Sequence, residues 1–376
     1  MLSRIYQIFL KSKNLKVKNL QSKKTMILDK KVMDQIRFKN SITICTRYTE
    51  TYKIILLKTI LKKYLYFLKE DILTIYLEEL IKITNPKYIV SFNDYNLSFY
   101  RLKNKFKNIK FVFFACTFRS NSSLVDILSK IDEKLKIDYM CVWGKNTIKY
   151  YNKFLVSNFI VSGSYRNNLY KIKLKKDYFK DNNFVFISQF RLSKDWQKKN
   201  YYYYKKLLPI IHDYCKQKKH KLYIIGSKKD SVEKKSEINW YKYLLKGRNY
   251  YFLNKDNSKF FSYNASDKFT NFITFSSSLG FELASRNNKV VFFNKPKLTP
   301  KKFVYMESFF IKKTGPFWTN KYNKKEILRL MDYLVNTDYK KTINNRKKYI
   351  DPYLIYDYQN QNLRKKLKKE NINIFN

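Results

Sequence analysis

A row of small polar residues stands between two apolar runs at residues 275–293, which read FSSSLGFELASRNNKVVFF. An apolar run precedes this row and a short helical pattern follows it, so the row is predicted to be a strand-to-helix turn. Backbone N–H groups at a helix N-terminus, surrounded by small side chains, suit a phosphate or diphosphate. Glu282 is predicted to project from the first turn of that helix, where it can accept hydrogen bonds from a pair of sugar hydroxyls. The turn candidates are Ser276, Ser277, Ser278 and Gly280.

A helix cap explains part of this pattern without a ligand. Serine is a favoured N-cap, and an acidic residue early in a helix interacts favourably with the helix dipole. A capping box would need a serine three residues before the acid, and Leu279 stands there, so a box does not account for Glu282. No G-x-x-x-x-G-K-[ST] motif occurs, which excludes a P-loop. We therefore favour a nucleotide-binding turn.

Other polar residues follow predicted strands directly. Arg191 comes after FVFISQF, and its planar guanidinium suits a phosphate, while Gln189 is placed to bond a base or a sugar. Gly226 and Ser227 end the run KLYIIGS at the same sheet edge, although tight-turn chemistry alone would explain them. Asp94 lies just after KYIVSF and is the candidate base for deprotonating a substrate hydroxyl, with a helix N-cap as the alternative.

The remaining candidates concern a second strand end, the hinge and metals. Arg119 and Ser120 follow FVFFACTF and are predicted to contact a second substrate. A group of polar residues lies where the predicted first domain ends and the second begins. They are predicted either to contact the ligand or to hydrogen-bond between the domains; these are Ser164, Arg166, Asn167 and Asn168. The cluster HDYCKQKKH, with two histidines and one cysteine, lacks a fourth ligand at standard spacing, so we expect no metal site.

Short apolar runs alternate with helical patterns from about residue 24 onward. Continuous apolar runs of four to seven residues are typical of parallel strands buried on both faces. A long helical stretch is predicted from about Thr51 to Thr84. The predicted strands are TMILD, SITICT, KYIVSF, KFVFFAC, DYMCVW and NFIVSG in a first series, and NFVFISQF, KLYIIGS, NYYFL, FTNFITF and KVVFF in a second.

Two such series predict an α/β protein with two facing, doubly wound parallel-sheet domains and ligands at the carboxyl ends of the strands. The 376 residues suffice for two cores. The predicted division is an N-terminal domain over 1–164, a linker over 165–182, a second domain over 183–338 that holds the serine-rich turn, and a helical C-terminal segment over 339–376.

The composition is strongly basic, with 79 Lys and Arg against 29 Asp and Glu, a formal charge of +50. Arginine, which nucleic-acid readers place at bidentate contacts, is scarce compared with lysine. The charge therefore favours anionic partners in general, including an anionic membrane surface, and we expect no nucleic acid. No run approaches the ~20 apolar residues of a membrane span, and the opening residues do not resemble a signal peptide. Four widely spaced cysteines indicate a reducing, cytoplasmic compartment.

The order of these motifs resembles that of GT-B glycosyltransferases, specifically bacterial surface-carbohydrate (O-antigen or capsule) biosynthesis proteins. The resemblance covers roughly residues 85–335. It rests on KYIVSFNDYNLSFYRLKNKFKNIKFVFFAC, DYMCVWG, FIVSGSYRNN, FVFISQFR, the serine-rich stretch and GPFWTNKY. The first 80 residues match poorly, and FVFFACTFRS lacks the glycine expected after that strand.

The resemblance implies a GT-B fold of two Rossmann-like domains, with a nucleotide-sugar donor on the domain over 183–338 and the acceptor facing it from the domain over 1–164. On this resemblance Arg119 and Ser120 line the acceptor side, and Asp94 deprotonates the acceptor hydroxyl. The resemblance also implies that Ser277, Ser278 and Gly280 hold the donor phosphates and that Glu282 holds the ribose. Catalysis in this class generally needs no bound metal or other cofactor. The expectation is a cytoplasmic glycosyltransferase, peripheral at the inner face of the plasma membrane, that extends a surface polysaccharide (lipopolysaccharide O-antigen or capsule) or a lipid-linked glycan.

Three alternatives stay open. One is a polyol-phosphate transferase of teichoic-acid type, which resembles a two-histidine mechanism, whereas His212 and His220 here fall in one segment. Another is a basic nucleic-acid-binding protein, which predicts binding with a steep salt dependence. The third is a catalytically silent subunit of a glycan-assembly complex.

Overall fold

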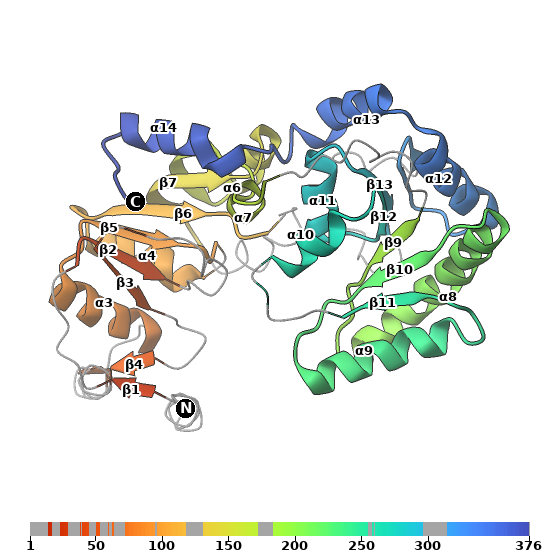
Figure 1. The fold of residues 1–376 in the computed structure, drawn as a ribbon. Coiled ribbons are helices and arrows are strands. Elements are labelled where there is room, and N and C mark those ends of the chain that lie inside the picture. The colour runs from red at the N-terminus through yellow and green to blue at the C-terminus, as the bar shows by residue number, and fades with distance from the viewer. Residues whose placement is uncertain are drawn as a thin grey trace. The chain divides into compact units, whose positions relative to one another are not determined.

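The computed structural model divides into two compact units, each described here by itself (Figure 1). Unit 1 comprises residues 1–118, 124–166 and 360–376, and unit 2 comprises 119–123 and 167–359. The C-terminal segment that we predicted over 339–376 is thus shared between the units. The structure describes residues 14–16, 23–28, 38, 40–44, 50–52, 59, 62–63, 72–94, 96–117, 131–171, 183–254, 258, 260–295 and 314–375.

Unit 1 contains a six-stranded parallel sheet in the order β3-β2-β5-β6-β7-β8. Its strands match the six apolar runs predicted for the first series. β2 and β5 have every residue buried, as expected for strands covered on both faces. The bounds are β2 Thr25–Leu28, β3 Ser41–Ile44, β5 Tyr88–Ser91, β6 Lys110–Phe114, β7 Leu135–Val142 and β8 Leu155–Val161.

The long helix predicted from residue 51 is wrong at its beginning. Residues 50–52 form β4 (Glu50–Tyr52), which pairs in parallel with β1 (Asn14–Lys16). α3 spans Ile72–Thr84, and residues 59 and 62–63 of the predicted stretch are also helical. β-branched and aromatic residues around position 51 suit a strand as well as a helix, so the apolar pattern alone did not separate the two.

The other helical elements of unit 1 are short, apart from α4 and α14. Asn96 caps α4, since its side chain accepts a hydrogen bond from the backbone N–H of Ser98 at 3.1 Å. The chain returns to unit 1 at its C-terminal end, where Tyr88 donates to the carbonyl of Asn371 at 3.1 Å and Phe38 bridges Phe375. The elements are α4 Leu97–Lys105, the 3-10 turn Lys145–Thr147, α6 Ile148–Tyr151, α7 Tyr165–Asn168, which runs into unit 2, and α14 Gln361–Lys369.

Unit 2 contains a seven-stranded sheet in the order β11-β10-β9-β12-β13-β15-β14, parallel except for β14. The chain moves outward from β9 to β11 and then returns to the other side of β9 at β12. The strand order therefore reverses between β9 and β12, which is where open α/β sheets bind ligands. The bounds are β9 Phe184–Ile187, β10 Leu222–Ile225, β11 Tyr251–Leu253, β12 Asn271–Thr274, β13 Lys289–Phe293, β14 Thr314–Gly315 and β15 Trp318–Thr319.

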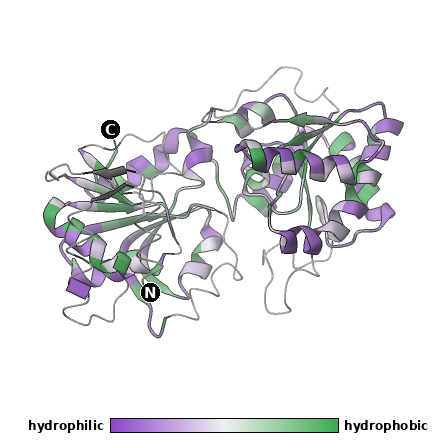
Figure 2. Cartoon of the chain, turned by 90° about the horizontal axis from the view of Figure 1, so that it is seen from below, coloured by the Kyte–Doolittle hydropathy of each residue, from purple (hydrophilic) through white to green (hydrophobic). Residues whose placement is uncertain are grey.

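The helices of unit 2 cover both faces of its sheet, with α8 and α9 on one face and α10 and α11 on the other (Figure 1). The strands are largely hydrophobic, and much of the outer helix surface is hydrophilic (Figure 2). The bounds are α8 Lys194–Gln217, α9 Ser231–Leu244, α10 Phe261–Ser266, α11 Ser278–Ser285, α12 Lys324–Asn336 and α13 Tyr339–Asn345, followed by a π-helical turn Arg346–Ile350 and a 3-10 turn Tyr358–Asn360.

Candidate functional site

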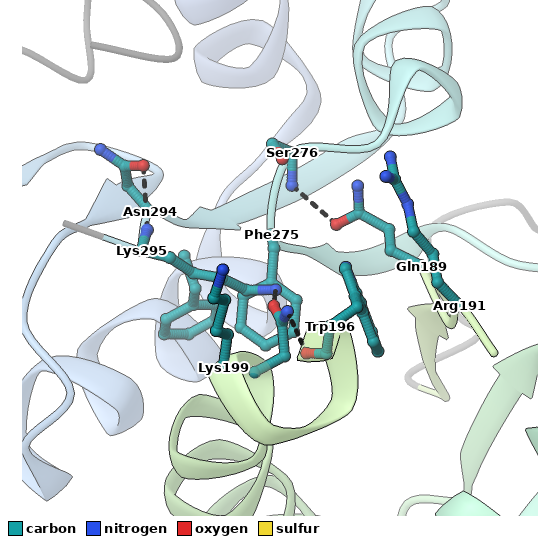
Figure 3. Close-up of a pocket in the computed structure, with 10 residues that line it drawn as sticks. Gln189, Arg191, Trp196, Lys199, Phe275, Ser276, Asn294 and Lys295 are labelled. Carbon is teal, nitrogen blue, oxygen red and sulfur yellow. Dashed lines mark hydrogen bonds between the residues drawn. The ribbon is translucent and has the colours of Figure 1, made fainter. Parts of the chain in front are cut away.

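A pocket of about 320 Å³ opens at the carboxyl edge of the unit 2 sheet, where the strand order reverses (Figure 3). Its walls come from the residues after β9, β12 and β13 and from the first turns of α8. This is the position at which a doubly wound sheet presents its ligand site. The lining residues are Gln189, Arg191, Trp196, Lys199, Asn200, Phe275, Ser276, Phe293, Asn294 and Lys295.

The pocket is cationic. Three of its ten lining residues, Arg191, Lys199 and Lys295, carry basic side chains, and none of the ten is acidic. Arg191 and Lys199 are exposed, so their charges reach a ligand through water, whereas Lys295 is partly buried. A concave surface with charges of one sign attracts a ligand of the opposite sign. The chemistry of the lining therefore suits an anion such as a phosphate or diphosphate.

Lys295 occupies an aromatic environment in the wall of the pocket. Its Nζ lies 3.5 Å from the centroid of the Phe275 ring and 4.9 Å from that of Tyr204. The same Nζ donates to Oδ1 of Asn200 at 2.7 Å. Burial, followed by repulsion from the Arg191 guanidinium, lowers the pKa of Lys295 well below its usual value.

The serine-rich turn borders this pocket through Ser276. The backbone N–H of Ser276 donates to Oε1 of Gln189 at 3.1 Å, which joins the turn to the loop after β9 (Figure 3). Ser277 is the N-cap of α11, and its side chain makes no capping hydrogen bond, while Ser278 is the first helical residue. The N-terminus of α11 thus lies one residue from the pocket lining. The phosphate contacts predicted for the three serines stay predictions.

Gly280 has a packing role that sequence reasoning did not foresee. Its N–H donates to the carbonyl of Ser277 at 2.9 Å within the helix, and the phosphate contact predicted for it stays a prediction. A Cβ added at Gly280 would lie 2.7 Å from Cγ2 of Thr274. The glycine therefore permits the close approach of α11 to β12.

Glu282 lies beyond the first turn of α11, contrary to the predicted position, because the helix begins only at Ser278. It is buried, with 7% of its surface exposed, and its Oε2 accepts a hydrogen bond from the hydroxyl of Tyr263 at 2.9 Å. It does not line the described pocket. The ribose contact predicted for Glu282 stays a prediction.

The loop after β10 is held by an internal carboxylate. Glu237 of α9 accepts hydrogen bonds from the backbone N–H of Ser227 at 2.9 Å, from its hydroxyl at 2.8 Å and from the N–H of Lys228 at 3.0 Å. Ser188 also donates its hydroxyl to Glu237. A Cβ at Gly226 would lie 2.8 Å from the Phe252 ring, so packing explains that glycine. The ligand contacts predicted for Gly226 and Ser227 stay predictions, and neither residue lines the pocket.

Asp94 is fully buried in unit 1, near the carboxyl end of β5. Its Oδ2 accepts a hydrogen bond from the Tyr151 hydroxyl at 2.6 Å, and its Oδ1 accepts one from the Cys116 thiol at 3.1 Å. Because Asn96 caps α4, the N-cap alternative does not describe Asp94. These contacts hold the carboxylate in a fixed position, and its role as a base stays a prediction.

The hinge candidates divide between the units. Asn167 bonds within unit 2, donating to Oγ of Ser285 at 3.2 Å and accepting from Nε of Arg286 at 2.6 Å. Asn168 likewise accepts from the backbone N–H of Asp357 at 2.9 Å. Ser164 is buried and Arg166 partly buried, and both belong to unit 1. The acceptor-side candidates Arg119 and Ser120 lie outside the described residues.

Among the described residues, no group of three or more His, Cys, Asp or Glu side chains is arranged to hold a metal ion. In the same part of the chain, no helix combines the length and apolar character needed to cross a membrane.

Seven of the ten lining residues were not among the candidates from the sequence, including Phe275 and Phe293. Asn294 and Lys295 follow β13 directly, so the rule that selected Arg191 would have found them too. The run YYYYKKLLPIIHDYCKQ predicts a helix only over residues 201–217, whereas α8 begins at Lys194, so three lining residues of its first turns were missed. Those three residues are Trp196, Lys199 and Asn200.

Two Rossmann-like units, each with a parallel sheet, define the protein as an α/β protein with a GT-B type fold. The family model described as "putative O-antigen biosynthesis protein" matches residues 112–371. This match spans more than half of the chain, and the protein belongs to that family.

Solved structures with similar folds cover nearly the whole chain. Staphylococcus aureus MnaA, solved with UDP, matches 93% of this chain and 97% of its own with a TM-score of 0.52 and 13% identity. UDP-GlcNAc 2-epimerases from Methanocaldococcus jannaschii (TM-score 0.51, 10% identity) and Neisseria meningitidis (0.52, 12%) each match over 93% of this chain and 100% of theirs. At these identities the similarity establishes the fold. None of the curated proteins matches.

Proposed function

We propose that the protein is a glycosyltransferase that moves a sugar from a nucleotide-activated donor to a cell-surface polysaccharide or lipid-linked glycan. The observation that carries the proposal is the acid-free pocket at the strand-order reversal of unit 2, where Arg191, Lys199 and Lys295 gather beside the turn into α11. Membership of an O-antigen biosynthesis family supports it, since building such a polymer requires glycosidic bonds to be formed. Similar folds solved with UDP and UDP-GlcNAc support a nucleotide-sugar ligand.

The chemistry asked of the pocket is stabilisation of a leaving nucleotide. As the glycosidic bond to phosphate breaks, negative charge develops on the departing phosphoryl oxygens. Preorganised cations and a helix N-terminus stabilise that charge without waiting for solvent to reorganise. In this proposal Arg191 and Lys199 contact the phosphates, the N-terminus of α11 adds its partial positive charge, and no resident metal is required.

On the acceptor, a hydroxyl must lose its proton as it attacks the sugar. Asp94 is the proposed base. To act in this way it exchanges the hydrogen bond from Cys116 for one from the acceptor hydroxyl, because a thiol is the weaker donor. The bond from Tyr151 then keeps the carboxylate oriented. Asp94→Asn would remove the base while keeping the shape.

Contact with an anionic membrane surface is also proposed, through α14. Leu363 and Leu367 of this helix are buried in unit 1, and the remaining face carries only basic charge. A basic residue near an anionic leaflet contributes roughly 1 kcal/mol of attraction. Loss of sedimentation with anionic vesicles on neutralising this face would support the assignment. The exposed basic residues are Arg364, Lys365, Lys366, Lys368 and Lys369.

The decisive experiment supplies radiolabelled nucleotide-sugars and a glycolipid extract from a bacterium making a surface polysaccharide, and follows label into the lipid-linked fraction. The expected result is donor-dependent incorporation with release of the nucleotide, abolished in Arg191→Ala and retained in Lys216→Met, whose lysine is exposed outside the pocket on α8. Conversion of the donor into another nucleotide-sugar, without incorporation, would contradict the proposal.

A further inference from the structure

Lys295 is surrounded by aromatic rings, and no carboxylate lines its pocket among the residues that the structure describes. Its Nζ contacts the rings of Phe275, Tyr204 and Trp196, at 3.5, 4.9 and 5.8 Å from their centroids. The hydrogen-bond acceptor that it uses is the neutral amide oxygen of Asn200. Aromatic faces attract an ammonium but do not neutralise it. Buried charges in proteins are normally paired, and here the pocket lining holds no acid.

The groups facing Lys295 make this environment electropositive. Arg191 approaches from the loop after β9 and Lys199 from α8, and both are cationic. Tyr204, also on α8, is a neutral phenol, because burial raises its pKa. The other lining side chains from the ends of β9, β12 and β13 and from α8 are uncharged, namely Gln189, Trp196, Asn200, Phe275, Ser276, Phe293 and Asn294. These surroundings therefore disfavour the ammonium, and an anion bound beside it would stabilise the ammonium.

We propose that Lys295 is a phosphate-contact residue that takes up a proton from solvent when an anion enters the pocket. The geometry supports this, since Nζ lies in the wall of a cavity whose other cations are Arg191 and Lys199. The inference rests on the proposed function only in identifying the anion as the phosphates of the donor. No covalent step is involved, because the amine gains one proton on binding and returns it on release. Anion binding is thereby coupled to pH through one residue.

The test uses inorganic pyrophosphate as the probe and isothermal titration calorimetry of the full chain in two buffers with different ionisation enthalpies. The difference in heat between the buffers gives the protons taken up per anion bound. Lys295→Arg keeps a positive charge that does not titrate below about pH 12. The proton uptake of this variant is therefore the baseline contributed by pyrophosphate and all other groups. Lys295→Met removes the charge but keeps an apolar chain against the rings. Lys216→Met is the charge-matched control outside the pocket.

On binding pyrophosphate, wild type is expected to take up as much as one proton more than Lys295→Arg. The difference should be largest at pH values between the lowered pKa of Lys295 without the anion and the usual lysine pKa of about 10.4. In that range its affinity falls as pH rises, since the neutral amine binds the anion less well. Lys295→Met is expected to bind roughly 10- to 100-fold more weakly, the effect of losing one charge-assisted hydrogen bond. Lys216→Met should match wild type in both readouts.

Equal proton uptake by wild type and Lys295→Arg, or undiminished affinity in Lys295→Met, would overturn the inference. So would failure of wild type to bind pyrophosphate. These outcomes are separate from failure of the proposed function. Nucleotide-sugar turnover without pyrophosphate binding would contradict only the role of Lys295. The expected calorimetric result without any sugar transfer would contradict only the proposed transferase function.

Discussion

The side chain of Gln189 accepts a hydrogen bond from the backbone N–H of Ser276 at 3.1 Å. This bond crosses the point where the strand order of the unit 2 sheet reverses, because Gln189 follows β9 and Ser276 follows β12. It fixes the turn into α11 against the loop that carries Arg191, and so sets the spacing of the two sides of the pocket.

Replacing Gln189 by Ala should weaken nucleotide binding without unfolding the protein. One neutral hydrogen bond contributes about 0.5–1.5 kcal/mol, so an increase of roughly two- to tenfold in Kd is expected. Calorimetric titration measures this change in Kd, with whichever of UDP, GDP, dTDP, CDP and CMP raises the Tm of wild type. Gln217→Ala, exposed at the end of α8, is the control and should bind as wild type does. An unchanged Kd in Gln189→Ala would show that the bond does not organise the pocket.

Replacing Arg191 by Lys tests whether the planar fork matters or only the charge. Lysine keeps the charge but loses bidentate geometry, so we expect an intermediate loss of nucleotide affinity, with Arg191→Ala weaker by roughly 10- to 100-fold than wild type. Because Arg191 is exposed, both variants should keep the urea midpoint of wild type. Equal affinity of the alanine variant and wild type would exclude Arg191 from the site.

Gly280→Ala should destabilise the protein by about 1–3 kcal/mol, the usual cost of overpacking a filled interior. The added Cβ would lie 2.7 Å from Cγ2 of Thr274. Urea unfolding gives the loss. Adding Thr274→Ser removes that methyl and keeps the hydroxyl that accepts from the N–H of Ser277. The double variant should recover part of the lost unfolding free energy. If the effects of the two substitutions simply add, the contact between the new Cβ and Thr274 is not the cause of the loss.

Glu237→Ala should reduce the free energy of unfolding by about 3 kcal/mol or more, because it leaves several buried donors without their charged acceptor. The affected donors include the N–H groups of Ser227 and Lys228. Glu233→Ala on the same helix, which loses a more exposed ion pair, is the comparison and should change the urea midpoint little. Similar midpoints for the two variants would contradict the role of Glu237 in holding this loop.

The stability of the ligand-free protein should depend on pH through Lys295. Since burial lowers its pKa, the folded state binds fewer protons than the unfolded state, and stability rises with pH up to the usual lysine pKa of about 10.4. The stability of Lys295→Met relative to wild type should therefore be highest near neutral pH and decline as pH increases. Urea midpoints at several pH values measure this. A pH-independent difference would contradict it, and Lys216→Met should run parallel to wild type.

Most strands could be predicted from the sequence because buried parallel strands are apolar on both faces. KYIVSF and KVVFF correspond to β5 and β13 within one or two residues at each end. The pairing of residues 14–16 with residues 50–52 could not be predicted, since no local pattern marks which distant segments meet. The same holds for the C-terminal end, where Phe375 packs against Tyr165 of unit 1.

The candidate site was predicted in part. Arg191, Gln189 and Ser276 were found because carboxyl ends of parallel strands share one sheet edge, and all three line the pocket. The packing role of Gly280 was missed because the sequence does not show that its Cα faces Thr274. The aromatic surroundings of Lys295 come from α8 and β12, which only the tertiary fold brings together.

The central claim is that the basic pocket of unit 2 holds the phosphates of an activated sugar. Thermal unfolding in the presence of UDP, GDP, dTDP, CDP or CMP tests it most directly, since a ligand that binds the native state raises Tm. We predict that at least one of these nucleotides raises the Tm of wild type, and that the shift is lost in the Arg191→Ala, Lys199→Met double variant. A shift of the same size in that variant, or no shift with any nucleotide in wild type, would contradict the account.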